Sequence, residues 1–293
     1  MRQCVSGQFK SGAVASNAMS GLVKAYVKFD QLKPHIANAC EAIKDYMAIF
    51  IFEDGRIGSG TFVRTGGLSG LLTAWHVAEH LSSFQEFILC ATDSPHRLSI
   101  SSDLMDHVPI GVVPQGSMPE EGPDLSFLII RDEGLLEKLR TIKSFYPLDS
   151  SRSPCIHPLL NQKIWWGVAG SPGESLKRSH ENYQGGPLTR LLNFVGADRF
   201  PFQMFEKGDF DYLQLTVSSG HAPFPKDYDG MSGGGFWTLP MEIDPSGEVR
   251  HRTPILAGVE FAQSGWQNGE RILTGHGSRS IYACLRETLK MHV

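Results

Sequence analysis

The stretch "DYDGMSGGGFWTLP", residues 227–240, places a single serine, Ser232, within a run that contains four glycines. Glycine loses more conformational freedom on folding than any other residue, so four of them around one hydroxyl need a physical reason. Turns are also rich in glycine and serine, and the stretch alone is compatible with an ordinary surface loop. The alternative is a loop whose backbone amides surround an oxyanion beside a nucleophilic serine. That alternative requires a histidine and an acid elsewhere in the chain.

The residues around Ser232 distinguish between two kinds of nucleophilic serine. G-x-S-x-G is the pattern of the nucleophile elbow, in which the serine lies between a strand and a helix. Here the proline-containing stretch 221–225 precedes the serine and Pro240 follows it closely, so neither a strand nor a helix is favoured. The elbow also needs its histidine after the serine. None of the three histidines downstream of Ser232 lies in a stretch that suggests a catalytic base. The sequence therefore disfavours the elbow.

Suitable partners lie upstream of Ser232. His76 directly follows the apolar stretch "GLLTAW", and Asp124 begins the apolar stretch "DLSFLII". A serine hydroxyl needs a nearby base to become nucleophilic, and imidazole titrates close to neutral pH. A carboxylate on the other ring nitrogen fixes the tautomer of that base. The order histidine, aspartate, serine is the chymotrypsin order, and it predicts a catalytic triad of His76, Asp124 and Ser232.

Each of these residues also has a simpler explanation when it is taken alone. His76 fits a helix cap or a core histidine, and Asp124 fits an acid at the start of a strand or in a turn. Asp103 and Asp106 are alternative acids, although neither of them begins an apolar strand. The prediction of the triad therefore depends on all three residue types occurring together in this order.

Seven short motifs extend the pattern over about residues 50 to 286: "SGTFV", "LLTAWHV", "PDLSFLII", "VAGSPG", "GMSGGGF", "ILAGVEF" and "SIYACL". In this order they resemble the trypsin-like (chymotrypsin-fold, PA clan) serine peptidases, closer in style to bacterial and HtrA-type domains than to secreted digestive enzymes. The resemblance implies a mainly β fold of two six-stranded Greek-key β-barrels, with flanking N- and C-terminal helices. It also implies endopeptidase activity on protein or peptide substrates, without metal or organic cofactor.

The resemblance assigns an oxyanion hole to the backbone amides of Gly230 and Ser232. Two positions depart from the family pattern. Met231 stands where members activated by cleavage carry an acid, so activation by a new N-terminal amine is not expected. Val77 replaces a disulfide cysteine of secreted members, which agrees with a reducing compartment.

The resemblance also implies the residues of the specificity pocket. Lys226 lies six residues before Ser232, at the expected base of the primary pocket, where its charge would repel Lys and Arg side chains. A shift of one residue would place Asp227 there instead and reverse this expectation. The sequence predicts a specificity that is not trypsin-like, with pocket walls supplied by Phe261, Ala262 and Gln263.

The chain divides into three predicted parts. Residues 1–45 form an N-terminal extension whose apolar residues over 33–47 have helical spacing. Residues 46–150 form a first β-barrel with His76 and Asp124, and they include hairpins with turns at 54–55 and 66–67 and a strand at "IGVVP", 110–114. Residues 151–293 form a second β-barrel with Ser232 and a C-terminal helix.

Composition limits the partners and the compartment. The 293 residues are 41% hydrophobic and 20% charged, which is ordinary for a globular protein. A net charge of −4 does not indicate a nucleic-acid partner, and no apolar run is long enough to predict a membrane span. The five cysteines show no paired spacing and no export signal is evident, so a cytoplasmic location is expected. The oligomeric state is left open.

Two other functions remain open. "HVAEH" matches the inverted zinc-peptidase motif, in which His76 and His80 would bind zinc and Glu79 would act as the base. That function needs a long helix and a distal acidic ligand, and it leaves the Ser232 loop unexplained. The second is a latent or inactive trypsin-like module that serves as a binding protein or scaffold.

Overall fold

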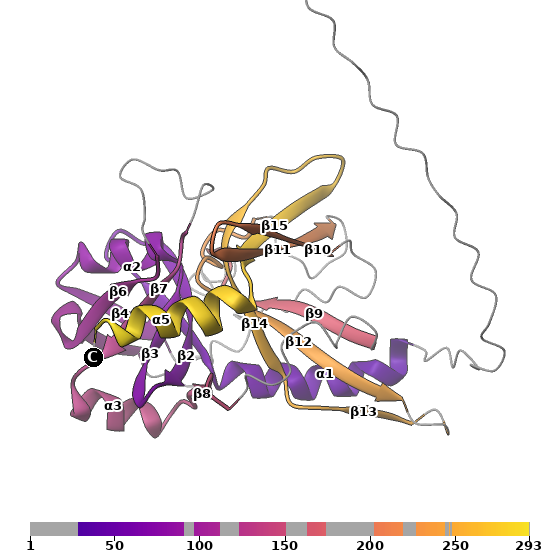
Figure 1. The fold of residues 1–293 in the computed structure, drawn as a ribbon, viewed down its shortest axis with the longest axis horizontal. Coiled ribbons are helices and arrows are strands. Elements are labelled where there is room, and N and C mark those ends of the chain that lie inside the picture. The colour runs from indigo at the N-terminus through magenta and orange to yellow at the C-terminus, as the bar shows by residue number, and fades with distance from the viewer. Residues whose placement is uncertain are drawn as a thin grey trace, which may run out of the picture.

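The structure is a computed structural model that describes residues 29–90, 97–111, 123–150, 163–173, 202–218, 227–243, 246 and 248–292. Within these residues the chain forms two antiparallel sheets that lie side by side, with few and flanking helices (Figure 1). The predicted mainly β class is confirmed, and the two curled antiparallel sheets are consistent with the predicted two-barrel arrangement of chymotrypsin type. The sheets occupy residues 47–147 and 163–276, while the exact division at residue 150 stays a prediction.

The first sheet follows the strand order β5-β4-β1-β2-β3-β7-β6, and β8 pairs in parallel with β2. The predicted turns at 54–55 and 66–67 join β1 to β2 and β2 to β3, and their glycines have positive φ. The described strands of this sheet are β1 (Met47–Ile51), β2 (Ile57–Thr65), β3 (Leu68–Thr73), β4 (Glu86–Cys90), β5 (Arg97–Ser101), β6 (Met105–Pro109), β7 (Ser126–Ile130) and β8 (Tyr146–Pro147).

The second sheet follows the order β10-β11-β15-β14-β12-β13, and β9 pairs with β12. Its described strands are β9 (Lys163–Ala169), β10 (Phe202–Lys207), β11 (Phe210–Ser218), β12 (Gly235–Ile243), β13 (Val249–His251), β14 (Ile255–Gln263) and β15 (Glu270–His276). The described part of the chain thus holds eight and seven strands instead of six in each barrel. The short strands β8 and β13 account for part of the difference.

The predicted N- and C-terminal helices are present as α1 (Phe29–Lys44) and as a π-helix, Ser280–Cys284, that continues into α5 (Leu285–Lys290). The helical turn after the first apolar hairpin is α2 (Trp75–Ser82). Helix α3 (Glu133–Arg140) was not predicted, although the side chain of Asp132 caps it by accepting from Leu135 N at 2.6 Å. The predicted strand at 110–114 is wrong for its described residues, because β6 ends at Pro109 and residues 112–114 lie outside the described residues.

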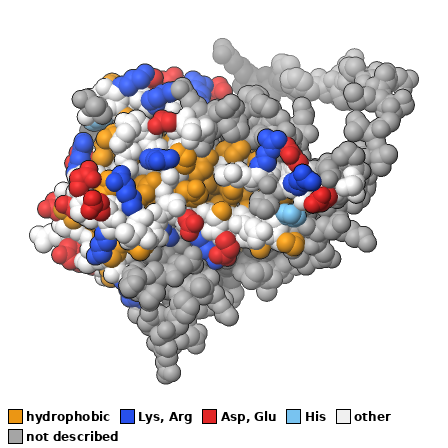
Figure 2. Space-filling model, turned by 90° about the horizontal axis from the view of Figure 1, so that it is seen from below, with side chains coloured by type: hydrophobic (Ala, Val, Ile, Leu, Met, Phe, Trp, Pro, Cys, Tyr) orange, Lys and Arg blue, Asp and Glu red, His pale blue; other side chains and the backbone are white. Residues whose placement is uncertain are grey.

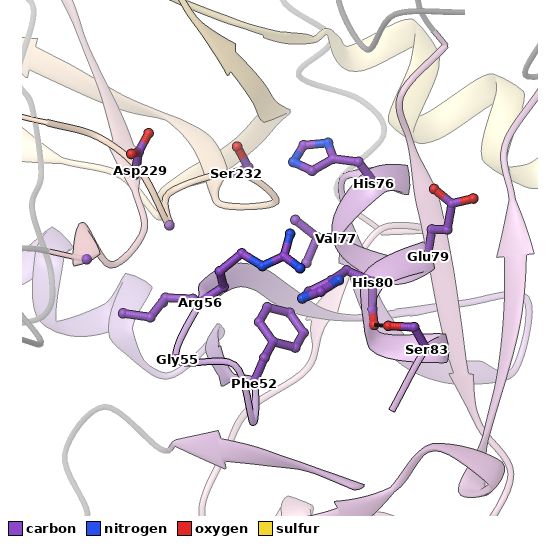
Figure 3. Close-up of a pocket in the computed structure, with 13 residues that line it drawn as sticks. Phe52, Gly55, Arg56, His76, Val77, Glu79, His80, Ser83, Asp229 and Ser232 are labelled. Atoms are coloured by element: carbon purple, nitrogen blue, oxygen red, sulfur yellow. Dashed lines mark hydrogen bonds between the residues drawn. The ribbon is translucent and has the colours of Figure 1, made fainter. Parts of the chain in front are cut away.

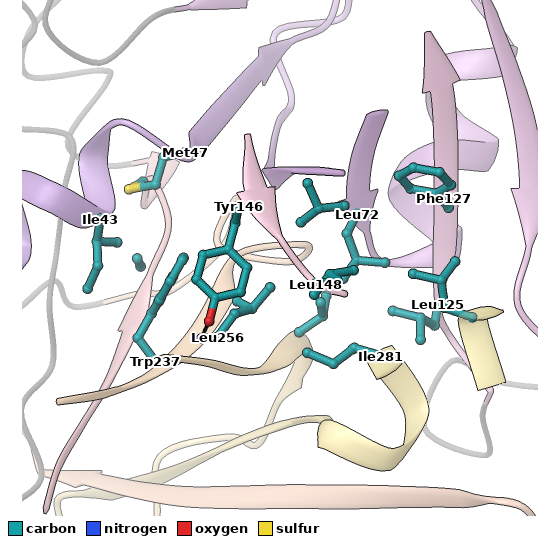
Figure 4. Packing of buried hydrophobic residues seen from close by; sticks show 14 of the residues in the cluster. Ile43, Met47, Leu72, Leu125, Phe127, Tyr146, Leu148, Trp237, Leu256 and Ile281 are labelled. Atoms are coloured by element: carbon teal, nitrogen blue, oxygen red, sulfur yellow. Dashed lines mark hydrogen bonds between the residues drawn. The ribbon is translucent and has the colours of Figure 1, made fainter. Parts of the chain in front are cut away.

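A shared core fixes the two sheets relative to each other. Leu72 and Phe127 of the first sheet pack in one cluster with Trp237 and Leu256 of the second (Figure 4). Tyr146 on β8 packs edge-on against the Trp237 ring at 5.3 Å, and its hydroxyl accepts from Leu256 N at 3.3 Å. Burying one such side chain contributes roughly 1.5–3 kcal/mol, so this cluster holds the sheets in a defined arrangement.

The helices complete this core from both ends of the chain. Ile43 of α1 and Ile281, Leu285 and Leu289 of the C-terminal helices all belong to the same buried cluster. Figure 1 shows α1 alongside β13 of the second sheet, although α1 precedes the first sheet in sequence.

The described surface is mixed in character. On the face seen from below, hydrophobic side chains gather toward the middle, and charged side chains lie toward the periphery (Figure 2). No helix of the described residues is long and apolar enough to cross a membrane. The cysteines within the described residues, Cys40, Cys90 and Cys284, are all free thiols.

Candidate active site

His76 is fixed at the start of α2 by one carboxylate. Asp124, which lies just before β7 and is 1% exposed, accepts from His76 N at 2.9 Å through Oδ1 and from Nδ1 at 2.7 Å through Oδ2. The first turn of α2 has no acidic residue of its own, so Asp124 also supplies the negative group that a helix N-terminus favours. Because a carboxylate accepts only, Nδ1 carries the proton and Nε2 is left as an acceptor.

The two rival acids are placed elsewhere. Asp106 is exposed on β6 and accepts from Arg131 Nε at 2.6 Å. Asp103 is exposed in the short 3₁₀ turn before β6. Of the three aspartates considered from the sequence, Asp124 is the one that hydrogen-bonds to His76.

The second sheet supports Asp124 through a residue that the sequence analysis did not connect with the triad. Asp124 N donates to His276 Nε2 at 2.9 Å, and His276 on β15 is fully buried. Its ring lies 4.9 Å from the Phe261 ring and 5.0 Å from the Tyr212 ring. Burial lowers the pKa of His276 to about 4, so that its ring is a neutral hydrogen-bond acceptor near neutral pH.

The glycines around Ser232 are required by the packing of the loop. Gly230 and Gly233 have φ of +92° and +89°, a conformation that favours glycine. A Cβ at Gly230 would lie 2.7 Å from the carbonyl oxygen of Ser171, and a Cβ at Gly233 would collide with the carbonyl oxygen of Ser59. The Ser232 loop is therefore a tightly packed turn between the sheets.

Hydrogen bonds from both sheets hold this loop. From β2, Ser59 N donates to Ser232 O at 2.9 Å and Ser59 Oγ donates to Gly230 O at 2.7 Å. From β14, Glu260 O accepts from Gly233 N at 2.7 Å. The amides of Gly230 and Ser232 donate to no group in the described part of the chain. Those two amides are the pair that the resemblance assigns to the oxyanion hole.

His76, Gly230 and Ser232 line one pocket with a volume of about 640 Å³. Figure 3 shows the His76 ring extending from α2 toward the loop that carries Ser232. No hydrogen bond joins His76 and Ser232, both of which the structure describes; Ser232 Oγ instead donates to Phe261 O at 3.4 Å. The rest of the described lining is Phe52, Gly55, Arg56, Ile57, Val77, Glu79, His80, Ser83, Gly173 and Asp229.

Three predicted specificity residues, Phe261, Ala262 and Gln263, are not among the described residues that line this pocket. Phe261 is buried against Tyr212 and His276, whereas Ala262 and Gln263 are half-buried at the end of β14. Gln263 Nε2 donates to Asp227 Oδ1 at 3.1 Å. Lys226 lies outside the described residues.

Asp227, the alternative pocket base, is paired with a cation. Arg271 Nη1 donates to its Oδ1 at 2.9 Å, and the side chain of Arg271 is 9% exposed. Burial alone would raise the pKa of Asp227, but the hydrogen bonds from Arg271 and Gln263 outweigh it and lower the pKa. The charge of Asp227 is thus already compensated within the protein.

The two histidines of the H-x-x-E-H motif face different carboxylates. His76 is bonded to Asp124, whereas His80 Nε2 lies 3.1 Å from Asp54 Oδ2. Helix α2 has only eight residues, shorter than the zinc hypothesis requires. Among the described residues, no group of three or more His, Cys, Asp or Glu side chains is placed to hold a metal ion.

Neither a protein-family model nor a curated protein sequence matches the chain. Among solved structures, it is similar to the thermostable serine protease AL20 from an extremophilic microorganism, with 10% identity, 86% of this chain and 98% of that chain covered, and a TM-score of 0.45. The HtrA-type protease AlgW with a tripeptide shows 16% identity, coverage of 87% and 64%, and a TM-score of 0.44. The protease Anisep from Arthrobacter nicotinovorans shows 13% identity, coverage of 84% and 93%, and a TM-score of 0.43. AL20 is a serine protease, AlgW an HtrA-type protease and Anisep a protease, and the likeness of this chain to them is one of fold.

Proposed function

We propose that this protein is a serine endopeptidase in which Ser232 is the nucleophile, His76 the general base and Asp124 the residue that orients the base. The observation that carries the proposal is the pair of hydrogen bonds that His76 N and Nδ1 donate to the Asp124 carboxylate, because they direct the ring into the pocket that contains Ser232. Neither bond is needed for an ordinary surface histidine. Together they reproduce the geometry by which a carboxylate prepares an imidazole to accept a proton.

The reaction would proceed in two halves. Ser232 Oγ attacks the carbonyl carbon of the peptide bond while its proton passes to His76 Nε2. The C–N bond then breaks, and His76 returns that proton to the leaving amine, which leaves an acyl-enzyme. A water molecule attacks the ester with the same base, and Ser232 recovers its proton as the acid product departs.

The oxyanion formed in each half would be bound by the amides of Gly230 and Ser232. Both amides lack another acceptor in the described chain, and the loop that carries them is held on two sides. Donors that are already oriented stabilise the transition state without reorganising during the reaction.

A latent binding or scaffold module remains the second candidate, and one observation favours it. The Ser232 hydroxyl donates to Phe261 O and makes no bond to His76, although the structure describes all three residues. A serine held in that orientation would not react until it rotated toward the base. Catalytic hydrogen bonds are often completed only when substrate binds, so the same geometry is also compatible with an active enzyme.

Labelling with a fluorophosphonate probe separates the two candidates. We expect the wild-type protein to form a covalent adduct, Ser232→Ala to form none, and Ser83→Ala, which changes another serine of the same pocket, to react like wild type. Unreactive wild-type protein with an intact fold would favour the latent module. Labelling of Ser232→Ala would exclude Ser232 as the nucleophile.

A further inference from the structure

We propose that Glu260 is a positioning residue that works as a neutral carboxylic acid and, once ionised, holds the Ser232 hydroxyl away from His76, so that high pH inactivates the site. This inference rests on the proposed function. It goes beyond the triad because it assigns to a buried residue of β14 the control of when the nucleophile can reach its base.

The position of Glu260 is the first support. The residue is 1% exposed and lies on β14 directly beneath the Ser232 loop. Its backbone bonds the loop twice, because Glu260 O accepts from Gly233 N at 2.7 Å and Glu260 N donates to Gly234 O at 2.8 Å. Glu260 is therefore held directly against the segment that carries the nucleophile.

The surroundings of the carboxyl group are the second support. Glu260 Oε2 is buried and has no hydrogen-bond partner in the described chain, an arrangement that is costly for a charged oxygen. The charged and titratable groups that face it are Asp124 from the start of β7 and Asp229 from the Ser232 loop, and both of these add negative charge. Two histidines of the same region, His76 and His276, are hydrogen-bonded to Asp124.

These surroundings determine the protonation state of Glu260. Burial, followed by the negative charge of Asp124, raises the pKa of Glu260 well above its ordinary value. The nearby Ser232 hydroxyl acts in the opposite direction and lowers the pKa, although in this structure Ser232 Oγ donates to Phe261 O at 3.4 Å. The Glu260 carboxyl group therefore stays neutral to a higher pH than an ordinary glutamate. When it ionises, the Ser232 hydroxyl is the donor that can bond to it.

The chemical consequence is a competition for the Ser232 proton. A hydrogen bond to a carboxylate is roughly twice as strong as one to a neutral group, so ionised Glu260 would retain the hydroxyl on the side of β14. The Ser232 hydroxyl already points to that side, as its contact with Phe261 O shows. A second buried charge beside Asp124 would also oppose the oxyanion that forms in the reaction. Neutral Glu260 has neither effect.

The test is the pH dependence of fluorophosphonate labelling in three folded proteins. In wild type we expect the labelling rate to fall roughly tenfold between neutral pH and about pH 10, as expected when one bond worth about 1.4 kcal/mol competes with the reaction. Glu260→Gln keeps the shape without the ionisation and should lack this fall. Glu270→Gln, an exposed glutamate on β15, should follow wild type. Identical profiles for wild type and Glu260→Gln would overturn the inference.

A second measurement uses only wild-type protein and covers the case in which Glu260→Gln does not fold. With ¹³C-labelled glutamate carboxyls, NMR should show one protonated glutamate at neutral pH, with a midpoint that matches the loss of labelling. If every glutamate carboxyl is ionised at neutral pH, the inference is wrong. Failure of the proposed function is a different result: wild type would then remain unlabelled at every pH, whatever the NMR shows.

Discussion

At the scale of single residues, the geometry of the candidate site depends on side chains that have no proposed role in the reaction itself. Ser59 ties the first sheet to the Ser232 loop, and His276 ties the second sheet to Asp124. Both residues are fully buried, so their hydrogen bonds are protected from exchange with water. The reactive groups are therefore positioned by bonds that cross between the sheets.

The role of Asp124 leads to a quantitative prediction. Asp124→Asn should keep the fold but reverse the tautomer of His76, because an amide can donate to Nδ1. We expect the labelling rate to fall by a factor on the order of 10⁴, the size of the effect that the same substitution has on kcat in the chymotrypsin triad. Asp106→Asn, which alters only an exposed pair with Arg131, should leave the rate unchanged. A larger loss from Asp106→Asn than from Asp124→Asn would reassign the acid.

The glycines of the Ser232 loop allow a matched pair of variants. Gly233→Ala combines a positive φ with a collision against Ser59 O, so it should lower the free energy of unfolding by more than about 1 kcal/mol and reduce labelling. Gly265→Ala adds a Cβ that meets no atom within 4 Å and should change neither property. Denaturant unfolding and probe labelling of both variants provide the comparison. Equal behaviour of the two would mean that the loop is not constrained as described.

At the scale of elements, the hairpins β1–β2 and β2–β3 could be predicted from the sequence because glycine turns separate apolar strands locally. His76, Asp124 and Ser232 could be singled out for the same reason, since each lies at the edge of a recognisable local motif, and their catalytic roles stay a prediction. Helix α3 also has a local sequence signal, because Asp132 is a favourable N-cap residue, but that signal was not used in the prediction. The parallel strand β8 had no such signal, because its pairing with β2 depends on contacts distant in sequence.

The supporting residues of the site could not be predicted for a related reason. Glu260 and His276 sit on neighbouring strands, and their side chains meet the first sheet only after the two sheets pack. In the sequence Glu260 resembles any acid at a strand position. Its burial beside Asp124 is a property of the assembled sheets, and no spacing of residues encodes it locally.

Substrate specificity is expected to depend on two elements, because Arg271 on β15 pairs with Asp227 in the segment before Ser232. Because the charge of Asp227 is compensated, we expect a peptide-library profile that is not dominated by Lys or Arg at the cleaved position. Arg271→Gln removes the cation and should increase cleavage after Lys and Arg relative to wild type. A wild-type profile dominated by Lys or Arg would contradict this prediction.

At the scale of the whole molecule, two buried groups give opposite dependences of stability on pH. The pKa of His276 falls from 6.5 to about 4 on folding. Between these values the unfolded state binds a proton at this residue and the folded state does not, so the free energy of unfolding decreases as pH falls from 6.5 to about 4. The pKa of Glu260 rises above 4.5 on folding, so the folded state keeps a proton, and stability is lost as pH rises. Above pH 4.5 and below 6.5 the two contributions therefore oppose each other.

Replacing either residue should expose the pH dependence of stability that the other residue causes. Relative to wild type, the free energy of unfolding of Glu260→Gln should rise with pH between about 4.5 and 6.5, by up to about 1.4 kcal/mol per pH unit. That of His276→Gln should fall with pH by a similar amount over the same range. Denaturant unfolding at several pH values measures both slopes, and parallel curves for all three proteins would rule out these protonation states.

The measurement that tests the central claim most directly is the cleavage of a mixed peptide library in H₂¹⁸O, read by mass spectrometry. A serine endopeptidase should generate new internal peptide ends, with ¹⁸O in each new carboxyl group, because water resolves the acyl-enzyme. We predict these products for wild type and for Ser83→Ala, and none for Ser232→Ala. Products formed equally by Ser232→Ala, or no products from folded wild-type protein, would contradict the account.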